Sequence, residues 1–109
     1  FGGARPDHAY ANLSLLYLGK KGGAKVRLLS KKWVVTLENG FAELATKRGG
    51  YVSLVPFFES SHILSTKGLK YPAHDVTLYR EQSLGVSNEA EGESAEVTVA
   101  GETLVFVER

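Results

Sequence analysis

The sequence of 109 residues contains no cysteine, which excludes a disulfide scaffold and a zinc site built from thiolates. It contains no run of about 18 apolar residues, so we predict no membrane span. It also lacks methionine and a signal-like start, which indicates a processed or excised piece. Hydrophobic residues make up 43% of the chain, enough for one modest core, and we expect a single domain over residues 1–109.

Charge is unevenly distributed along the chain, although the net charge is only +1. Residues 1–80 hold 12 of the 13 basic residues and 5 acids, whereas residues 81–109 hold 7 acids and one base. The simplest interpretation is a solvated basic face and a solvated acidic segment. The alternative is a cluster that binds an anionic surface or a sulfated glycan. This cluster comprises Lys20, Lys21, Lys25, Arg27, Lys31 and Lys32. We expect no nucleic-acid partner, because no exposed aromatics are interleaved with these charges.

Strand-like patterns dominate the chain, and the clearest occupies residues 30–41. There Trp33 and β-branched residues precede Asn39-Gly40, a pair that favours a tight turn. Other strands are expected around Leu15, Val26, Leu54, Leu64 and Leu78, with a hairpin turn at residues 20–23. Residues 81–95 are expected to form an acidic loop, and residues 96–109 a terminal hairpin. No convincing helical periodicity is present. We therefore predict an all-β fold, a small antiparallel β-barrel with a β-sandwich as the alternative.

The order of several segments resembles the N-terminal half, or first β-barrel, of a trypsin/chymotrypsin-like serine protease. Phe1-Gly2-Gly3 resembles the activated N-terminus of that family, and Lys32-Trp33-Val34-Val35-Thr36 resembles the strand before the catalytic histidine. The stretch from Asp75 to Arg80 resembles the strand that carries the catalytic aspartate. The resemblance implies barrel strands over residues 1–80 and a secreted or extracellular protein.

The same resemblance implies that the chain is not an enzyme. Asn39 stands where the family has its histidine, and an amide cannot accept the serine proton. Asp75 would then be vestigial, and the nucleophilic serine belongs to a second barrel. The resemblance therefore implies a pseudoprotease, a serine protease homolog that functions in protein binding, with no catalytic residue, cofactor or metal. Two alternatives stay open: an unrelated adhesion or receptor interaction domain, and one chain of a cleaved protease.

Two further features bear on partners and processing. Phe57 and Phe58 follow Pro56 and fall outside strand alternation, so we predict that they bind another chain, such as a missing second barrel or a second copy. The alternative is that they cap the core of their own barrel. The basic residues Lys20, Lys21, Lys25 and Arg27 are the other candidate binding residues. Asn12-Leu13-Ser14 fits the pattern for N-glycosylation at Asn12.

Overall fold

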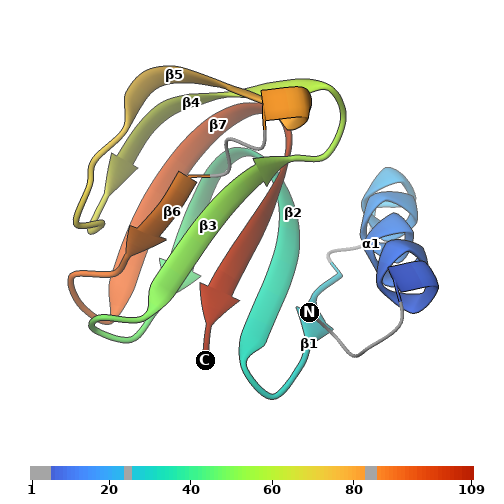
Figure 1. The fold of residues 1–109 in the computed structure, drawn as a ribbon, viewed down its shortest axis with the longest axis horizontal. Helices are drawn as coiled ribbons and strands as arrows, with labels where there is room; N and C mark the ends of the chain where they lie inside the picture. The colour runs from blue at the N-terminus through green and yellow to red at the C-terminus, as the bar shows by residue number, and fades with distance from the viewer. Residues whose placement is uncertain (1–5, 24–25, 83–85) are drawn as a thin grey trace.

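The computed structural model describes residues 6–23, 26–82 and 86–109, and the side chains of these residues except 6–13, 82, 86 and 87. The elements in chain order are α1 (Pro6–Lys21), β1 (Leu28–Leu29), β2 (Trp33–Ala45), β3 (Tyr51–Pro56), β4 (Ser60–Lys67), β5 (His74–Tyr79), the 3₁₀ helix η1 (Arg80–Gln82), β6 (Val86–Glu89) and β7 (Ser94–Glu108). Figure 1 shows the strands curved into one body, with α1 at its side.

The strands form one antiparallel sheet of seven strands, which confirms the predicted all-β class. The long strands β2 and β7 pair with each other along most of their length. The second half of β7 also pairs with β3, which carries β6 on its other edge. The first half of β7 pairs with β4, which carries β5. Because β2 and β7 bend, β3 and β6 form one wall of the body, and β4 and β5 form the other (Figure 1).

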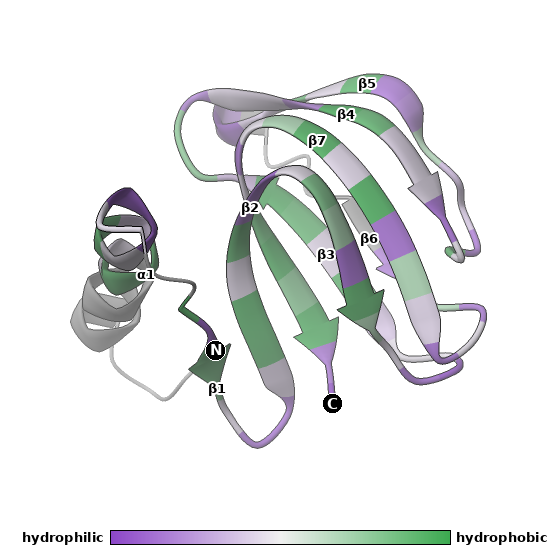
Figure 2. Ribbon diagram, turned by 180° about the vertical axis from the view of Figure 1, so that it is seen from behind, coloured by the Kyte–Doolittle hydropathy of each residue, from purple (hydrophilic) through white to green (hydrophobic). Residues whose placement is uncertain are grey.

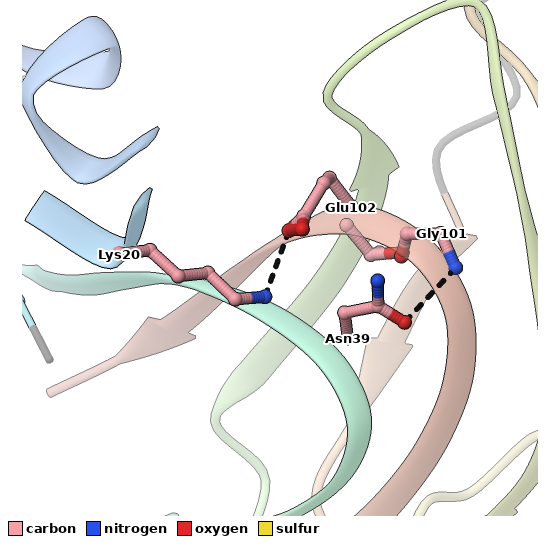
Figure 3. Close-up of polar contacts among 5 residues, drawn as sticks. Lys20, Asn39, Gly101 and Glu102 are labelled. Carbon is pink, nitrogen blue, oxygen red and sulfur yellow. Dashed lines mark hydrogen bonds and ion pairs between the residues drawn. The ribbon is translucent and has the colours of Figure 1, made fainter. Parts of the chain in front are cut away.

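The bend in the two long strands occurs at Asn39-Gly40 and Gly101. Gly40 has φ 109° and Gly101 has φ 94°, values that glycine adopts without steric cost. The pairing register shifts between Glu38 and Gly40, as in a β-bulge. The Oδ1 atom of Asn39 accepts a hydrogen bond of 3.2 Å from the Gly101 N–H (Figure 3). Chain-reversing turns were expected at these sites, but each strand continues beyond its glycine. A β-bulge accommodates a residue with positive φ without reversing the chain.

The first element is a helix, so the prediction of a strand around Leu15 was wrong. Pro6 occupies the first helical position, where its missing N–H costs nothing. The helix ends at two glycines: the Gly22 N–H donates to the Leu18 carbonyl at 3.1 Å, and Gly23 has φ 88°. Residues 20–23, where a hairpin turn was expected, form the end of this helix instead. Among the described residues, no helix is long and apolar enough to cross a membrane.

Two hydrophobic clusters lie on opposite faces of the sheet. The inner cluster fills the space between the two walls and includes Leu54, Ile63, Leu78, Val97, Val99, Val105 and Val107. The outer cluster lies between α1 and the sheet and consists of Leu16, Val35, Leu37 and Leu104, with Trp33 and other partly buried side chains against it. Alternation along β7 produces both, since neighbouring residues of a strand point to opposite faces. The apolar bands along β2 and β7 are visible in Figure 2.

Aromatic and ionic contacts attach α1 to the rest of the molecule. Tyr17 stacks on Phe57, with ring centroids 5.4 Å apart and an interplanar angle of 15°. It also meets Phe58 edge-on at 5.3 Å. At the end of the helix, the Lys20 Nζ lies 2.7 Å from a carboxylate oxygen of Glu102 (Figure 3). These contacts therefore hold α1 against the sheet.

We expect Leu16→Ala to lower the free energy of unfolding by roughly 2–5 kcal/mol, because it creates a cavity between α1 and the sheet. Leu16 is 1% exposed, whereas its neighbour Leu15 is 53% exposed and provides the matched control. Leu15→Ala should change the stability by no more than about 0.5 kcal/mol. Urea denaturation followed by circular dichroism measures both. Equal losses in the two variants would contradict the packing described for α1.

Candidate functional site

An exposed tyrosine on a firmly held backbone is the first feature of the candidate site. Tyr71 lies in the loop between β4 and β5, and its side chain is 59% exposed. Asn88 of β6 is only 2% exposed and binds both polar backbone groups of Tyr71. Its Oδ1 accepts from the Tyr71 N–H at 3.0 Å, and its Nδ2 donates to the Tyr71 carbonyl at 2.6 Å. The buried amide thus fixes the backbone from which the ring projects.

The rest of the loop is held against the turn between β6 and β7. The Lys70 N–H donates to the Glu89 carbonyl at 2.9 Å, and the Glu91 N–H donates to the Gly68 carbonyl at 2.9 Å. Gly68 has φ 80°, and a Cβ atom there would lie 2.7 Å from the Ser94 carbonyl oxygen. Only glycine suits this position, because any other side chain would be strained and would clash with backbone. Backbone bonds and close packing therefore fix the loop before any ligand is present.

A cation lies beside the Tyr71 ring, and a carboxylate lies beside that cation. The Lys70 Nζ lies 5.3 Å from the ring centroid and 3.7 Å from a carboxylate oxygen of Glu89. The Tyr71 side chain, and after it the Glu89 carboxylate, raise the pKa of Lys70 above its ordinary value. Like other lysines, Lys70 carries an ammonium group at neutral pH, and its contact with the ring is a cation–π interaction. We refer to Lys70, Tyr71, Asn88 and Glu89 as the Tyr71 cluster.

The Tyr71 cluster has the chemistry to bind a flat, positively charged ring. The face of an aromatic side chain is electron-rich and attracts cations, and it stacks on other aromatic rings. Glu89 supplies a carboxylate that can neutralise a bound cation. Among the described residues, no group of three or more His, Asp and Glu side chains is placed to hold a metal ion. The cluster thus suits binding and orientation of a heterocycle.

The residues expected to be vestiges of a protease site have separate structural roles. Asn39 binds the Gly101 N–H at the bend of the long strands. Asp75 has φ 58°, and its Oδ1 lies 2.5 Å from the Nε2 atom of His62. The other ring nitrogen of His62 lies 2.8 Å from the Thr77 hydroxyl. Asn39 therefore joins β2 to β7 at their bend, whereas Asp75 joins β5 to His62 of the neighbouring strand β4.

The predicted basic binding residues lie around the end of α1 and the start of the sheet. Lys20 forms an ion pair with Glu102, and Lys21 is exposed in the last turn of α1. Arg27 lines a recess of about 450 Å³ together with Glu38, Glu43 and apolar side chains of β2 and β7. Lys25 lies outside the described residues. Binding of an anionic surface by these residues stays a prediction.

The remaining candidate residues have contacts within the chain. Phe57 and Phe58 meet each other edge-on at 4.9 Å and both contact Tyr17 of α1. A contact with a partner through this pair stays a prediction. Asn12 lies in α1, outside the residues whose side chains are described, so its glycosylation also stays a prediction.

The sequence analysis did not identify the Tyr71 cluster. Tyr71 lies between the strands expected around Leu64 and Leu78, and Asn88 lies in the expected acidic loop, which the structure shows to contain β6. Residues 71 and 88 are 17 positions apart, and the antiparallel bridge between Leu69 and Ala90 brings their segments together. A detectable signal was Gly68, since a glycine in a short loop indicates a positive φ or a close backbone approach.

Comparisons with known proteins identify a family for this fold. Residues 41–104 match the family model described as thiamin pyrophosphokinase, vitamin B1 binding domain. A thiamine pyrophosphokinase of Bacillus subtilis is 35% identical over 91 residues, which are 80% of this chain and 42% of that protein. The chain therefore spans less than half the length of that curated relative.

Solved structures agree with the family match. The crystal structure of thiamine pyrophosphokinase from Bacillus subtilis has a TM-score of 0.85 and 26% identity, covering 97% of this chain and 51% of that one. The crystal structure of thiamin pyrophosphokinase from Geobacillus thermodenitrificans has a TM-score of 0.80 and 25% identity, covering 97% and 49%. Yeast thiamin pyrophosphokinase, at 17% identity, has a TM-score of 0.82 and shows the same fold.

These matches correct the expectations drawn from the protease resemblance. The resemblance itself was wrong, because Trp-Val-Val-Thr and similar segments are common strand chemistry. The predicted functions are therefore also wrong, namely a pseudoprotease, an adhesion or receptor domain, and one chain of a cleaved protease. The predicted secreted or extracellular location is wrong as well. The expectation that this chain alone is not an enzyme is also wrong, because its relatives are named as pyrophosphokinases. Residues 41–104 cover more than half of the sequence, and the chain belongs to the family of thiamin pyrophosphokinase vitamin B1 binding domains.

Proposed function

We propose that this chain binds thiamin and forms the vitamin-binding part of a thiamin pyrophosphokinase. The observation that carries the proposal is the exposed ring of Tyr71 on a backbone fixed by buried Asn88. All four residues of the Tyr71 cluster lie within the stretch that matches the family model, residues 41–104. The family description names vitamin B1 as the ligand of such domains, and the cluster has the chemistry that this ligand requires.

Thiamin consists of an aminopyrimidine ring and a positively charged thiazolium ring joined by one carbon atom. Either ring can stack on Tyr71, and the thiazolium gains additionally from the electron-rich face. The carboxylate of Glu89, which lies 3.7 Å from the Lys70 Nζ, can offset the thiazolium charge. A neutral pocket without a carboxylate would bind the same cation less well, because the charge would lose water without a replacement partner.

The pyrophosphokinase reaction transfers a diphosphate group to thiamin, so it also needs a site for the phosphate donor. The matched relatives are about twice as long as this chain. We propose that a further domain of the complete protein supplies the donor site. In this arrangement the Tyr71 cluster contributes to the reaction by holding the acceptor in a fixed position, which lowers the entropic cost of the transfer.

We expect Tyr71→Leu to weaken thiamin binding by about five- to tenfold, because leucine keeps apolar bulk but removes the aromatic face. Isothermal titration calorimetry with the complete protein measures the dissociation constant. Tyr79→Leu is the matched control, since Tyr79 is also exposed but lies at the opposite end of β5. The control should bind thiamin as the unmodified protein does. Unchanged affinity in both variants would exclude Tyr71 as the stacking surface.

We expect Asn88→Ala to lower the free energy of unfolding by roughly 1–3 kcal/mol, because the backbone groups of Tyr71 lose their partners. Thiamin affinity should fall as well, since the ring is then no longer held in place. Asn39→Ala removes one hydrogen bond at an exposed position and serves as the control. It should leave thiamin affinity unchanged. A folded Asn88→Ala protein with unchanged thiamin affinity would show that the hydrogen bonds of Asn88 do not position the Tyr71 ring.

A further inference from the structure

The Tyr71 ring already has a cation of the same chain next to its face. The Lys70 Nζ lies 5.3 Å from the ring centroid, within the range of a cation–π contact. The same atom lies 3.7 Å from the Glu89 carboxylate. Lys70 therefore makes, with its own chain, both of the contacts that the proposed function assigns to a bound cationic ring.

Both contacts of the Lys70 ammonium group are with side chains of its own chain. Its charge is already offset by Glu89, and the Tyr71 and Glu89 side chains together favour its charged form in this position. The Lys70 N–H donates a hydrogen bond to the Glu89 carbonyl, which fixes the backbone from which the Lys70 side chain extends. A ligand cation that approaches Tyr71 and Glu89 meets the ammonium group of Lys70 and is repelled until Lys70 moves away.

We propose that Lys70 is an internal ligand of the Tyr71 cluster that a cationic heterocycle displaces on binding. Lys70 is thereby a specificity-determining residue. It favours ligands that can replace both of its contacts over ligands that can replace only one. A ring without positive charge replaces the contact with Tyr71 but not the contact with Glu89. This inference rests on the proposed function, because it concerns the same surface and the same ligand.

Substitutions of Lys70 should change thiamin affinity in opposite directions. Lys70→Gln removes the competing cation and should tighten binding by about two- to fivefold, the equivalent of one exposed cation–π contact. Lys70→Arg should weaken binding, because a planar guanidinium stacks on an aromatic face better than an ammonium does. Lys67→Gln removes an exposed lysine of β4 and is the matched charge control, with no expected change. Isothermal titration calorimetry of the complete protein with thiamin gives the order of affinities.

Several outcomes overturn the inference. Weaker thiamin binding in Lys70→Gln would mean that Lys70 contacts the ligand directly. Equal affinity in Lys70→Arg and the unmodified protein would mean that only the net charge matters.

If the folded, unmodified protein does not bind thiamin, the proposed function fails, and nuclear magnetic resonance tests the contact of Lys70 with Tyr71 separately. The side-chain methylene signals of Lys70 should be shifted upfield by the Tyr71 ring and should return to ordinary positions in Tyr71→Leu. Ordinary positions in the unmodified protein would overturn the internal contact.

Discussion

The structure depends on the pairing of β2 with β7, and on the fact that both strands bend at the same level. The hydrogen bond from the Gly101 N–H to Asn39 joins the two strands where their register shifts. Because the strands bend together, one pair of strands contributes to both walls of the sheet. The inner cluster and the outer cluster then follow from ordinary alternation, since the β7 neighbours Leu104 and Val105 belong to the outer and the inner cluster, respectively.

The Tyr71 cluster shows how this fold presents a rigid surface from a loop. Loops usually gain order only from their own turns, but here the loop after β4 bonds to β6 and to the turn before β7. Asn88 is an example of a buried polar side chain whose hydrogen-bonding groups are used for structure. The exposed ring and its charged neighbours are therefore positioned by the sheet, and their geometry is set before a ligand arrives.

Local patterns in the sequence predicted the strands that alternate clearly, such as those at Val34, Leu54 and Leu78, and hence the all-β class. They failed at α1, because Leu13, Leu15 and Tyr17 fit a period of two while Leu16 is the residue that packs on the sheet. They also failed at Gly40 and Gly101, since a positive φ permits a bulge as readily as a turn. The Tyr71 cluster depends on the contact of residues 71 and 88, which no local spacing encodes.

The position of β7 in the chain has a consequence for synthesis on the ribosome. β7 pairs with β2, β3 and β4, and all three are translated before it. Until β7 emerges, each of these strands lacks this partner along one edge, and the wall of β3 and β6 is not joined to the wall of β4 and β5. Such edges and surfaces favour association between unfinished chains. The three strands can therefore join into one sheet only after β7 has been synthesised.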